Sequence, residues 1–344
     1  MPDNSHAARM KRQEKRLLDQ AGSLLLIGWL GSKVNEILWL LEEFRPAGFI
    51  YFRRNWPEGL EELKESIGEV NLRARKILKR PLLWAVDQEG GTVKRFDDEG
   101  LTLPSASEIG QLLLEKGHEE VEELTRGVGL KLKEIGFNLN LAPVLDVRSS
   151  SSYIASRSFS HDPTLASEVA ISYYRGFQKA GILTCGKHFP GLGSSIVDPH
   201  KDLPLVDDTV QVLWDRDGVP FRELIREEIP AIMTTHAIYR HLDSALPATF
   251  SPKVLRLLRQ EYAFKGLAIA DDLEMEGIRT LSSTEEAAVE AIRAGHDLAI
   301  VSKEPDRIRA ARDNLVKAID SAHIPPKRLQ EALRRLRKAL KQLV

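Results

Sequence analysis

Cysteine is almost absent from this chain of 344 residues: Cys185 is the only one, so no disulfide can form within the chain. Such cysteine usage is typical of proteins from reducing compartments. Cys185 lies in an apolar run, "GILTCG", where a free cysteine usually packs as a small hydrophobic residue. We therefore expect it to be buried and structural rather than a nucleophile.

Long apolar runs and an excess of charge are also lacking. The apolar "LLLIGWL" near the N-terminus is too short for a membrane span and too late for a usual signal peptide. Lys and Arg together number 49 and Asp and Glu 50, so no global charge favours nucleic acid or anionic membranes. We expect a cytoplasmic protein with neither partner. We also expect a monomer, although nothing in the sequence fixes the oligomeric state.

What the sequence does contain is a series of eight short apolar runs, each followed by a helix-like stretch. They begin near residues 23, 48, 82, 137, 182, 231, 266 and 297, and read "SLLLIGW", "GFIYF", "LLWAVD", "FNLNLAPVLDV", "ILTCGKH", "AIMTTH", "GLAIADD" and "DLAIVS". Runs that are apolar on both faces suit buried strands of a parallel sheet. The α/β pattern predicts a single-domain (β/α)8 TIM-type barrel over residues 22–344, after an N-terminal helical extension over residues 1–21. A doubly wound open sheet is the alternative, but no Gly-x-Gly-x-x-Gly follows the first run.

Several helix boundaries are marked. Ser251 before Pro252 is typical of an N-cap with proline at the first helical position. Ser283 and Glu286 fit a capping box, and Gly295 fits the end of that helix. The C-terminal "PPKRLQEALRRLRKALKQLV" reads as a basic amphipathic helix that packs on the barrel with a solvated charged face, in preference to a membrane or nucleic-acid role.

Ionisable side chains gather at the ends of the expected strands. Buried charges cost several kcal/mol unless they are paired, so packing alone does not explain them. The residues are Asp87, Asp146, Lys187, His188, His236, Asp271 and Asp272. In a barrel of this type the active site lies at the C-terminal ends of the strands. The sequence therefore predicts an active site at that end.

The motifs around these residues resemble glycoside hydrolase family 3. They read "VDQEGGTVKRF", "SRSFSHDP", "KHFPG" and "IADDLEMEGI", with "GFIYFRRN" and "PATFSPKVL" in matching places, and the resemblance runs from about residue 22 to 302. Within the family the chain looks like the single-domain β-N-acetylglucosaminidase (β-N-acetylhexosaminidase) branch. Little chain follows the eighth strand, and an Asp-x-His pair follows the fifth, where that branch places its acid/base dyad.

The resemblance implies a retaining, exo-acting enzyme that removes terminal β-linked N-acetylglucosamine, in the family's bacterial setting from peptidoglycan fragments. It implies a small carbohydrate substrate and no metal or organic cofactor. Asp271 would be the nucleophile, which a retaining glycosidase needs to form a covalent glycosyl-enzyme. The alternative is that Asp271 caps the next helix and Asp272 acts.

In the same resemblance His200 would be general acid and then general base, because an imidazole gives and takes a proton near neutrality. Asp198 would orient its ring. Residues two apart on an extended segment point to the same side, and Pro199 favours that form for Asp198. The alternative is that Asp198 and His200 are solvated loop residues without a catalytic role. Gly191 and Gly193 would let this loop swing over the substrate.

The sugar itself would be held by a mixture of donors and acceptors, as its hydroxyl groups require. The family match assigns this role to Asp87, Arg95, Arg157, Lys187 and His188. Asp146, His236 and Asp272 are expected to support these groups rather than touch the sugar.

The chain departs from the family pattern at Thr92, Leu192, Ser194 and Pro199, which leaves the catalytic set intact but puts loop contacts and the preference beyond the sugar in doubt. Four other functions stay open at this point. They are a β-glucosidase or an N-acetylglucosaminide phosphorylase of the same family, a metal-dependent barrel hydrolase, and a sugar-binding barrel without catalysis.

Overall fold

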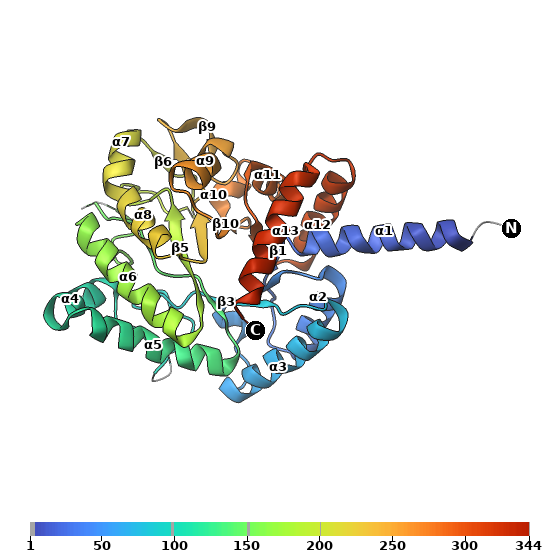
Figure 1. The fold of residues 1–344 in the computed structure, drawn as a ribbon, viewed down its shortest axis with the longest axis horizontal. Coiled ribbons are helices and arrows are strands. Elements are labelled where there is room, and N and C mark those ends of the chain that lie inside the picture. The colour runs from blue at the N-terminus through green and yellow to red at the C-terminus, as the bar shows by residue number, and fades with distance from the viewer. Residues whose placement is uncertain (1–3, 98–99, 150–151, 200, 344) are drawn as a thin grey trace.

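The computed structural model describes residues 4–97, 100–149, 152–199 and 201–343. At its centre is a closed barrel of parallel strands in the order β1-β11-β10-β7-β5-β4-β3-β2 (Figure 1). The barrel strands are β1 (Leu25–Ile27), β2 (Gly48–Tyr51), β3 (Leu83–Val86), β4 (Leu139–Asn140), β5 (Leu183–Phe189), β7 (Ala231–Thr234), β10 (Leu267–Asp272) and β11 (Leu298–Val301). Each overlaps one of the eight apolar runs, so the predicted (β/α)8 barrel is confirmed.

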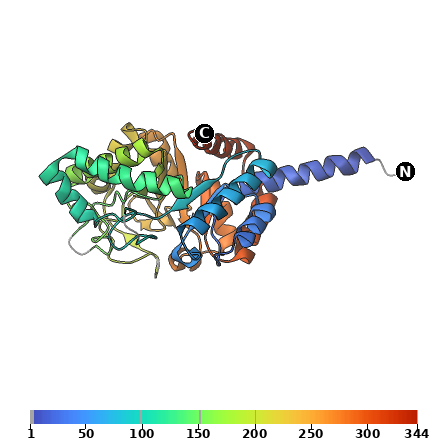
Figure 2. The same ribbon diagram turned by 90° about the horizontal axis from the view of Figure 1, so that it is seen from below.

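Helices surround the barrel, and α1 projects from it to one side (Figures 1 and 2). The helices are α1 (Asn4–Gly22), α2 (Val34–Phe44), α3 (Leu60–Ile77), α4 (Ala106–Lys116), α5 (His118–Ile135), α6 (Pro163–Ala180), α7 (Val210–Val212), α8 (Gly218–Arg226), α9 (Pro252–Arg256), α10 (Glu276–Arg279), α11 (Thr284–Ala294), α12 (Pro305–Asp320) and α13 (Pro326–Lys341). Three short helical turns complete them: η1 (Arg53–Asn55), η2 (Leu213–Asp217) and η3 (Leu257–Glu261). In the described part of the chain, no helix combines the length and apolar character that crossing a membrane requires.

The predicted N-caps are present, but the capping box at Ser283 is only half formed, because the Glu286 carboxylate accepts a hydrogen bond from the Ser282 hydroxyl and not from the Ser283 N–H. The Ser251 hydroxyl accepts a hydrogen bond from the Val254 N–H, with Pro252 at the first helical position. The Ser283 hydroxyl accepts one from the Glu286 N–H, and Gly295 follows the last residue of α11 with a φ of 133°. A positive φ of this size suits glycine, which has no Cβ to clash with the backbone.

A small three-stranded sheet was not predicted. It consists of β6 (Leu205–Val206), β8 (Ile238–Tyr239) and β9 (Asp243–Pro247). Its Tyr239 hydroxyl donates a 2.6 Å hydrogen bond to the carbonyl of Gly191, in the loop after β5. The small sheet therefore helps to fix the loop that follows the fifth barrel strand.

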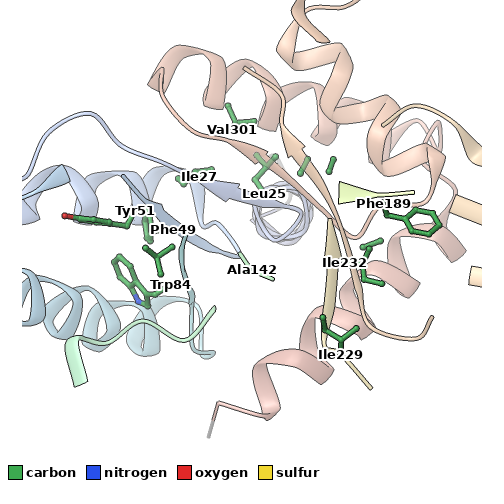
Figure 3. Close-up of a cluster of buried hydrophobic side chains, with 14 of the residues drawn as sticks. Leu25, Ile27, Phe49, Tyr51, Trp84, Ala142, Phe189, Ile229, Ile232 and Val301 are labelled. Atoms are coloured by element: carbon green, nitrogen blue, oxygen red, sulfur yellow. The ribbon is translucent and has the colours of Figure 1, made fainter. Parts of the chain in front are cut away.

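The core has two layers because successive strand residues point to opposite faces. One set packs between the strands and the helices, and Figure 3 shows Leu25, Ile27, Phe49, Tyr51 and Trp84 in this layer. The other set fills the barrel interior. Its members on the strands include Leu26, Ile50, Leu83, Ala85, Leu139, Leu141, Leu183, Cys185, Met233, Leu267, Ile269, Leu298 and Ile300. Cys185 is fully buried there, as predicted.

The C-terminal helix α13 closes one end of the barrel. Its Leu336, Ala339 and Leu340 belong to the same apolar cluster as the barrel interior. The cavity beside α13 is lined by Pro230 and Gly266, which immediately precede β7 and β10. The helix therefore covers the N-terminal ends of the strands and leaves the C-terminal ends free for a site.

Candidate active site

A cavity of about 540 Å³ lies at the C-terminal ends of the strands. Its floor is the last apolar layer of the barrel interior, formed by Ile50, Leu141, Met233 and Ile300. Its walls are polar and charged, and they include Asp87, Arg95, Arg157, Lys187, His188 and Asp271. The structure thus brings together six of the eight residues predicted from the sequence.

The alternation of strand residues explains why three of these side chains share the cavity. Leu183 and Cys185 on β5 point into the barrel, so Lys187 continues the inward series with a period of two. Leu267 and Ile269 place Asp271 in the same way, and the inward residues of β3 lead to Asp87. The alternation of side chains along the strands is therefore enough to direct the Lys187 ammonium and the carboxylates of Asp87 and Asp271 into the same cavity.

Lys187 lies at the centre of the charged wall. Its Nζ is 2.8 Å from Asp87 Oδ1 and 2.6 Å from Glu89 Oε1, and the residue is only 2% exposed. Burial alone would lower the pKa of the Lys187 ammonium, but the two carboxylates outweigh burial and raise it. Lys187 is therefore a permanent cation that can donate hydrogen bonds to a ligand.

The two carboxylates beside Lys187 each have an arginine partner as well. Arg95 Nη2 lies 2.8 Å from Asp87 Oδ2, and Arg157 binds Glu89 through two 2.8 Å hydrogen bonds. Burial opposes ionisation of both acids, yet the surrounding cations prevail: they lower the pKa of Asp87 strongly and that of Glu89 to about 2. The wall is a paired ionic network with fixed geometry, as precise recognition of sugar hydroxyl groups requires.

Asp146 orients His188, which is the supporting role expected for Asp146. The Asp146 Oδ2 atom lies 2.7 Å from His188 Nδ1, and Oδ1 accepts a 2.7 Å hydrogen bond from the Leu192 N–H. With Nδ1 held by the carboxylate, Nε2 is the ring atom left to face the cavity, 3.5 Å from Arg157 Nη2. Asp146 thus fixes both the ring and the start of the following loop.

The adjacent acids Asp271 and Asp272 differ in their surroundings. Burial would raise the pKa of Asp271, but His236, His188 and the Asp272 N–H lower it, so its carboxylate is ionised. Asp272 instead accepts a 2.5 Å hydrogen bond from Ser302 Oγ and one from the Glu274 N–H. Burial raises the pKa of Asp272 to about 6. His236 donates from Nε2 to the Asp272 carbonyl, which places it in the support of this segment.

The loop after β5 carries the predicted dyad, of which His200 lies outside the described residues. Asp198 directly precedes a turn residue, Pro199, and its carbonyl accepts hydrogen bonds from the N–H groups of Lys201 and Asp202. Asp198 is absent from the walls of the cavity. Burial raises the pKa of the Tyr153 hydroxyl, and the charges of Asp146, Asp271 and Asp198 add to the increase.

Backbone hydrogen bonds tie the same loop to two neighbouring segments. The carbonyls of Gly193 and Ser195 accept from Ser149 and Tyr153, in the loop after β4. The Pro199 carbonyl accepts from the N–H of Gly277 in α10, which follows the strand of Asp271. The segment that carries Asp198 is thus tied to the segment that carries Asp271.

Gly191 and Gly193, expected to give the loop freedom, instead permit close contacts. A Cβ on Gly193 would lie 1.7 Å from the Val147 carbonyl oxygen, and one on Gly191 would lie 2.3 Å from Asp217 Cβ. Asp217 is fully buried beneath the loop and pairs with Arg216 through Oδ2, while its Oδ1 has no partner among the described residues. Burial raises the pKa of Asp217 to about 7, although Arg216 opposes the shift.

This buried acid makes stability depend on pH. Between about pH 4 and 7 the unfolded chain has released the Asp217 proton while the folded protein retains it, so the free energy of unfolding falls as pH rises. We expect Asp217→Asn to remove about 1–3 kcal/mol of the fall between pH 5 and pH 7. Urea unfolding at both pH values measures this. The exposed Asp215→Asn is the matched control, and an unchanged pH dependence in Asp217→Asn would contradict the assignment.

Several charged groups that line the cavity were not predicted from the sequence, among them Glu89 and Arg54. Glu89 stands inside the motif "VDQEGGTVKRF", but its partner Arg157 is 68 residues away, so only the fold reveals the pair. Arg54 donates to the carbonyls of Trp29 and Ser302 and lines the cavity beside Asp272. Its only sequence signal was the motif "GFIYFRRN".

Among the described residues no group of three or more His, Cys, Asp or Glu side chains is placed to hold a metal ion. The site places the ionised carboxylate of Asp271 beside a paired network of cations and acids at the open end of a barrel. This arrangement suits a carbohydrate-active hydrolase that attacks a glycosidic bond with a carboxylate.

Comparison with known proteins agrees. Residues 22–339 match the family model described as the glycosyl hydrolase family 3 N terminal domain. The chain belongs to this family and is a glycoside hydrolase, which confirms the family predicted from the sequence.

Curated relatives carry the name beta-hexosaminidase. One from Haemophilus influenzae (strain PittEE) is 35% identical over 321 residues, covering 91% of this chain and 89% of that protein. One from Idiomarina loihiensis is 37% identical over 262 residues, covering 75% and 76%. Among solved structures, a glycoside hydrolase family 3 beta-N-acetylglucosaminidase from Paenibacillus sp. superposes with a TM-score of 0.89 at 32% sequence identity. The match covers 95% of this chain and 62% of that one.

Proposed function

We propose that the protein is a retaining exo-β-N-acetylglucosaminidase that uses Asp271 as its nucleophile. The observation that carries this proposal is the position of Asp271: an ionised carboxylate at the end of a rigid strand, facing a polar cavity. A retaining glycosidase needs such a group beneath the anomeric carbon to form a covalent glycosyl-enzyme. The curated relatives named beta-hexosaminidase support N-acetylhexosamine as the sugar.

The environment favours Asp271 over Asp272 as the attacking group. Asp271 continues the inward series of β10 and has a lowered pKa. Asp272 has a raised pKa, and its two carboxylate oxygens already accept hydrogen bonds from Ser302 and Glu274. A nucleophile must be ionised and must have a free lone pair directed at the substrate, and Asp271 meets both conditions better.

Protonation of the leaving oxygen is the task of the Asp198–His200 pair in this proposal. His200 gives the proton in the first step and removes one from water in the second, while Asp198 orients the ring. The ties from the loop to Gly277 and to the loop after β4 support delivery of this pair beside Asp271.

The sugar is held in this proposal by Asp87, Arg95, Arg157, Lys187 and His188. The pairing of Lys187 with Asp87 and Glu89 fixes these groups before the substrate binds, which reduces the entropy lost on binding. A cavity closed below by Ile50 and Met233 suits one terminal sugar, and thus exo-action. We further propose terminal N-acetylglucosamine of peptidoglycan fragments as the natural substrate.

Matched nitrophenyl β-N-acetylglucosaminide and β-glucoside test the sugar assignment. We expect the N-acetylglucosaminide to be cleaved with the higher kcat/KM by about tenfold or more, since one well-placed polar contact contributes 1–3 kcal/mol. Assays with and without inorganic phosphate separate hydrolysis from phosphorolysis. Cleavage of the glucoside alone, or a sugar phosphate as the main product, would contradict the proposal.

The contact between Pro199 and Gly277 gives a further expectation. A Cβ at Gly277 would lie 2.8 Å from the Pro199 carbonyl oxygen and 2.7 Å from that of Asp202, so alanine must displace the loop. We expect Gly277→Ala to lower kcat by about 10- to 100-fold, because small displacements of catalytic groups have effects of that size. Gly127→Ala on α5, where a Cβ meets nothing within 4 Å, is the control. Equal activity of the two variants would refute a positioning role for Gly277.

A further inference from the structure

A second hollow lies at the opposite end of the barrel, lined by residues of α1 and of the helix α13. Its volume is about 390 Å³, within the range typical of small-molecule sites. We call it the α1–α13 groove. Its lining includes Arg12, Lys15, Arg16, Asp19, Arg45, Leu78, Arg80, Leu333, Leu336, Arg337 and Leu340. None of these residues lines the active-site cavity.

The rim of the groove is cationic. Arg12, Lys15 and Arg16 stand at i, i+3 and i+4 on α1, so they share one face of that helix. Arg337 on α13 lines the same groove. All four side chains are exposed, and the described residues provide none of them with an ion pair or a side-chain hydrogen bond. The one carboxylate in the groove, Asp19, is bound to Arg45 and does not neutralise them.

This concentration of unpaired charge is unusual in the molecule. Most arginines elsewhere in the described chain bind a carboxylate or a carbonyl, and Arg80 in the same groove does so through the carbonyls of Pro46 and Arg45. Four cations that line one hollow repel one another. An anion bound between the two helices would relieve that repulsion and would be attracted by all four cations.

Four leucines also line the groove, and they are buried or half-buried while the rim cations are exposed, so we call them the floor: Leu78, Leu333, Leu336 and Leu340. A ligand that fills the groove therefore needs an anionic part for the rim and an apolar or planar part for the floor. Arginine binds phosphate in a bidentate manner better than lysine does, and three of the four rim cations are arginines. A flat lipid surface would reach the rim but not the recessed floor.

We propose that the α1–α13 groove binds a small phosphorylated ligand. Its phosphate groups contact Arg12, Arg16 and Arg337, and its planar or apolar body lies on the leucines of the floor. The proposal is independent of the sugar chemistry at the other end of the barrel.

Calorimetry of the full chain with adenosine diphosphate and with inorganic pyrophosphate tests this. We expect both to bind at one site in competition, with the nucleotide the tighter because it alone covers the floor. Arg16→Glu/Arg337→Glu should weaken binding by tenfold or more. Arg75→Glu/Arg256→Glu is the matched control, since it makes the same charge change at two other exposed, unpaired arginines, and it should stay within about twofold.

Both double variants should retain the glycosidase activity of the parent, which would show that each is folded. Three results would overturn the proposal: no binding of either probe by the parent at millimolar concentration, equal weakening in both double variants, or binding to phosphatidylglycerol vesicles without binding of the nucleotide.

Discussion

Replacement of Asp271 by alanine should lower kcat/KM for an aryl β-N-acetylglucosaminide by roughly 10⁴–10⁶-fold, the usual consequence of removing a covalent nucleophile. The fold should persist, because the Asp271 side chain lines the cavity and alanine leaves no void among the packed core side chains. Steady-state kinetics and a thermal unfolding profile measure the two effects. Azide, which fits the space vacated by the carboxylate, should restore turnover and yield the α-glycosyl azide.

Asp272→Asn is the control for this prediction. Asparagine keeps the shape of Asp272: its Oδ1 can still accept from the Glu274 N–H, and its Nδ2 can donate to the Ser302 hydroxyl. We expect a loss no greater than about 100-fold and no azide rescue, since Asp272 acts only through its neighbours. If Asp272→Asn were inactive and rescued by azide while Asp271→Ala remained active, Asp272 would be the nucleophile and Asp271 the supporting residue.

The second large effect is expected at Asp198. Asp198→Asn should lower kcat/KM for a substrate with a poor leaving group by roughly 10²–10⁴-fold, because general acid catalysis contributes that much. For a dinitrophenyl glycoside, whose leaving group needs no proton, kcat/KM should change only a few-fold. The turn itself is retained in the variant, since Lys201 and Asp202 donate to the main-chain carbonyl of residue 198.

A series of aryl glycosides of graded leaving-group pKa measures this difference. His200→Phe should behave in the same way, because the two residues act as one unit. A uniform loss across the series would assign Asp198 a structural role instead. Lys201→Ala, a change in the same turn without a catalytic assignment, is the control.

Much of the fold and half of the site follow from local pattern. Each barrel strand is a short apolar run, and the period of two that buries Leu183 and Cys185 also aims Lys187 at the cavity. The same logic places Asp87 and Asp271. Because parallel strands of a closed barrel present their C-terminal ends together, residues far apart in sequence could be expected to meet.

Other features depend on contacts that no local pattern contains. Glu89 pairs with Lys187 on β5 and with Arg157 in the loop after β4, both far from it in the sequence. Strands β6 and β8 have two residues each, too few for any periodicity to be recognised. The path of the loop at Asp198 depends on the N–H groups of Lys201, Asp202 and Gly277, which donate to the carbonyls of Asp198 and Pro199. The peptide bond between Lys187 and His188 is cis, which nothing in the sequence announces.

The central claim is that hydrolysis proceeds through a covalent bond between the sugar and Asp271. The most direct test is mass spectrometry of the protein after incubation with a fluorinated N-acetylglucosaminide whose second step is slow. We predict one added glycosyl mass, located after proteolysis on the peptide that contains Asp271. A protein that turns over the unmodified substrate but carries no adduct, or carries it on Asp272 or another residue, would contradict the claim.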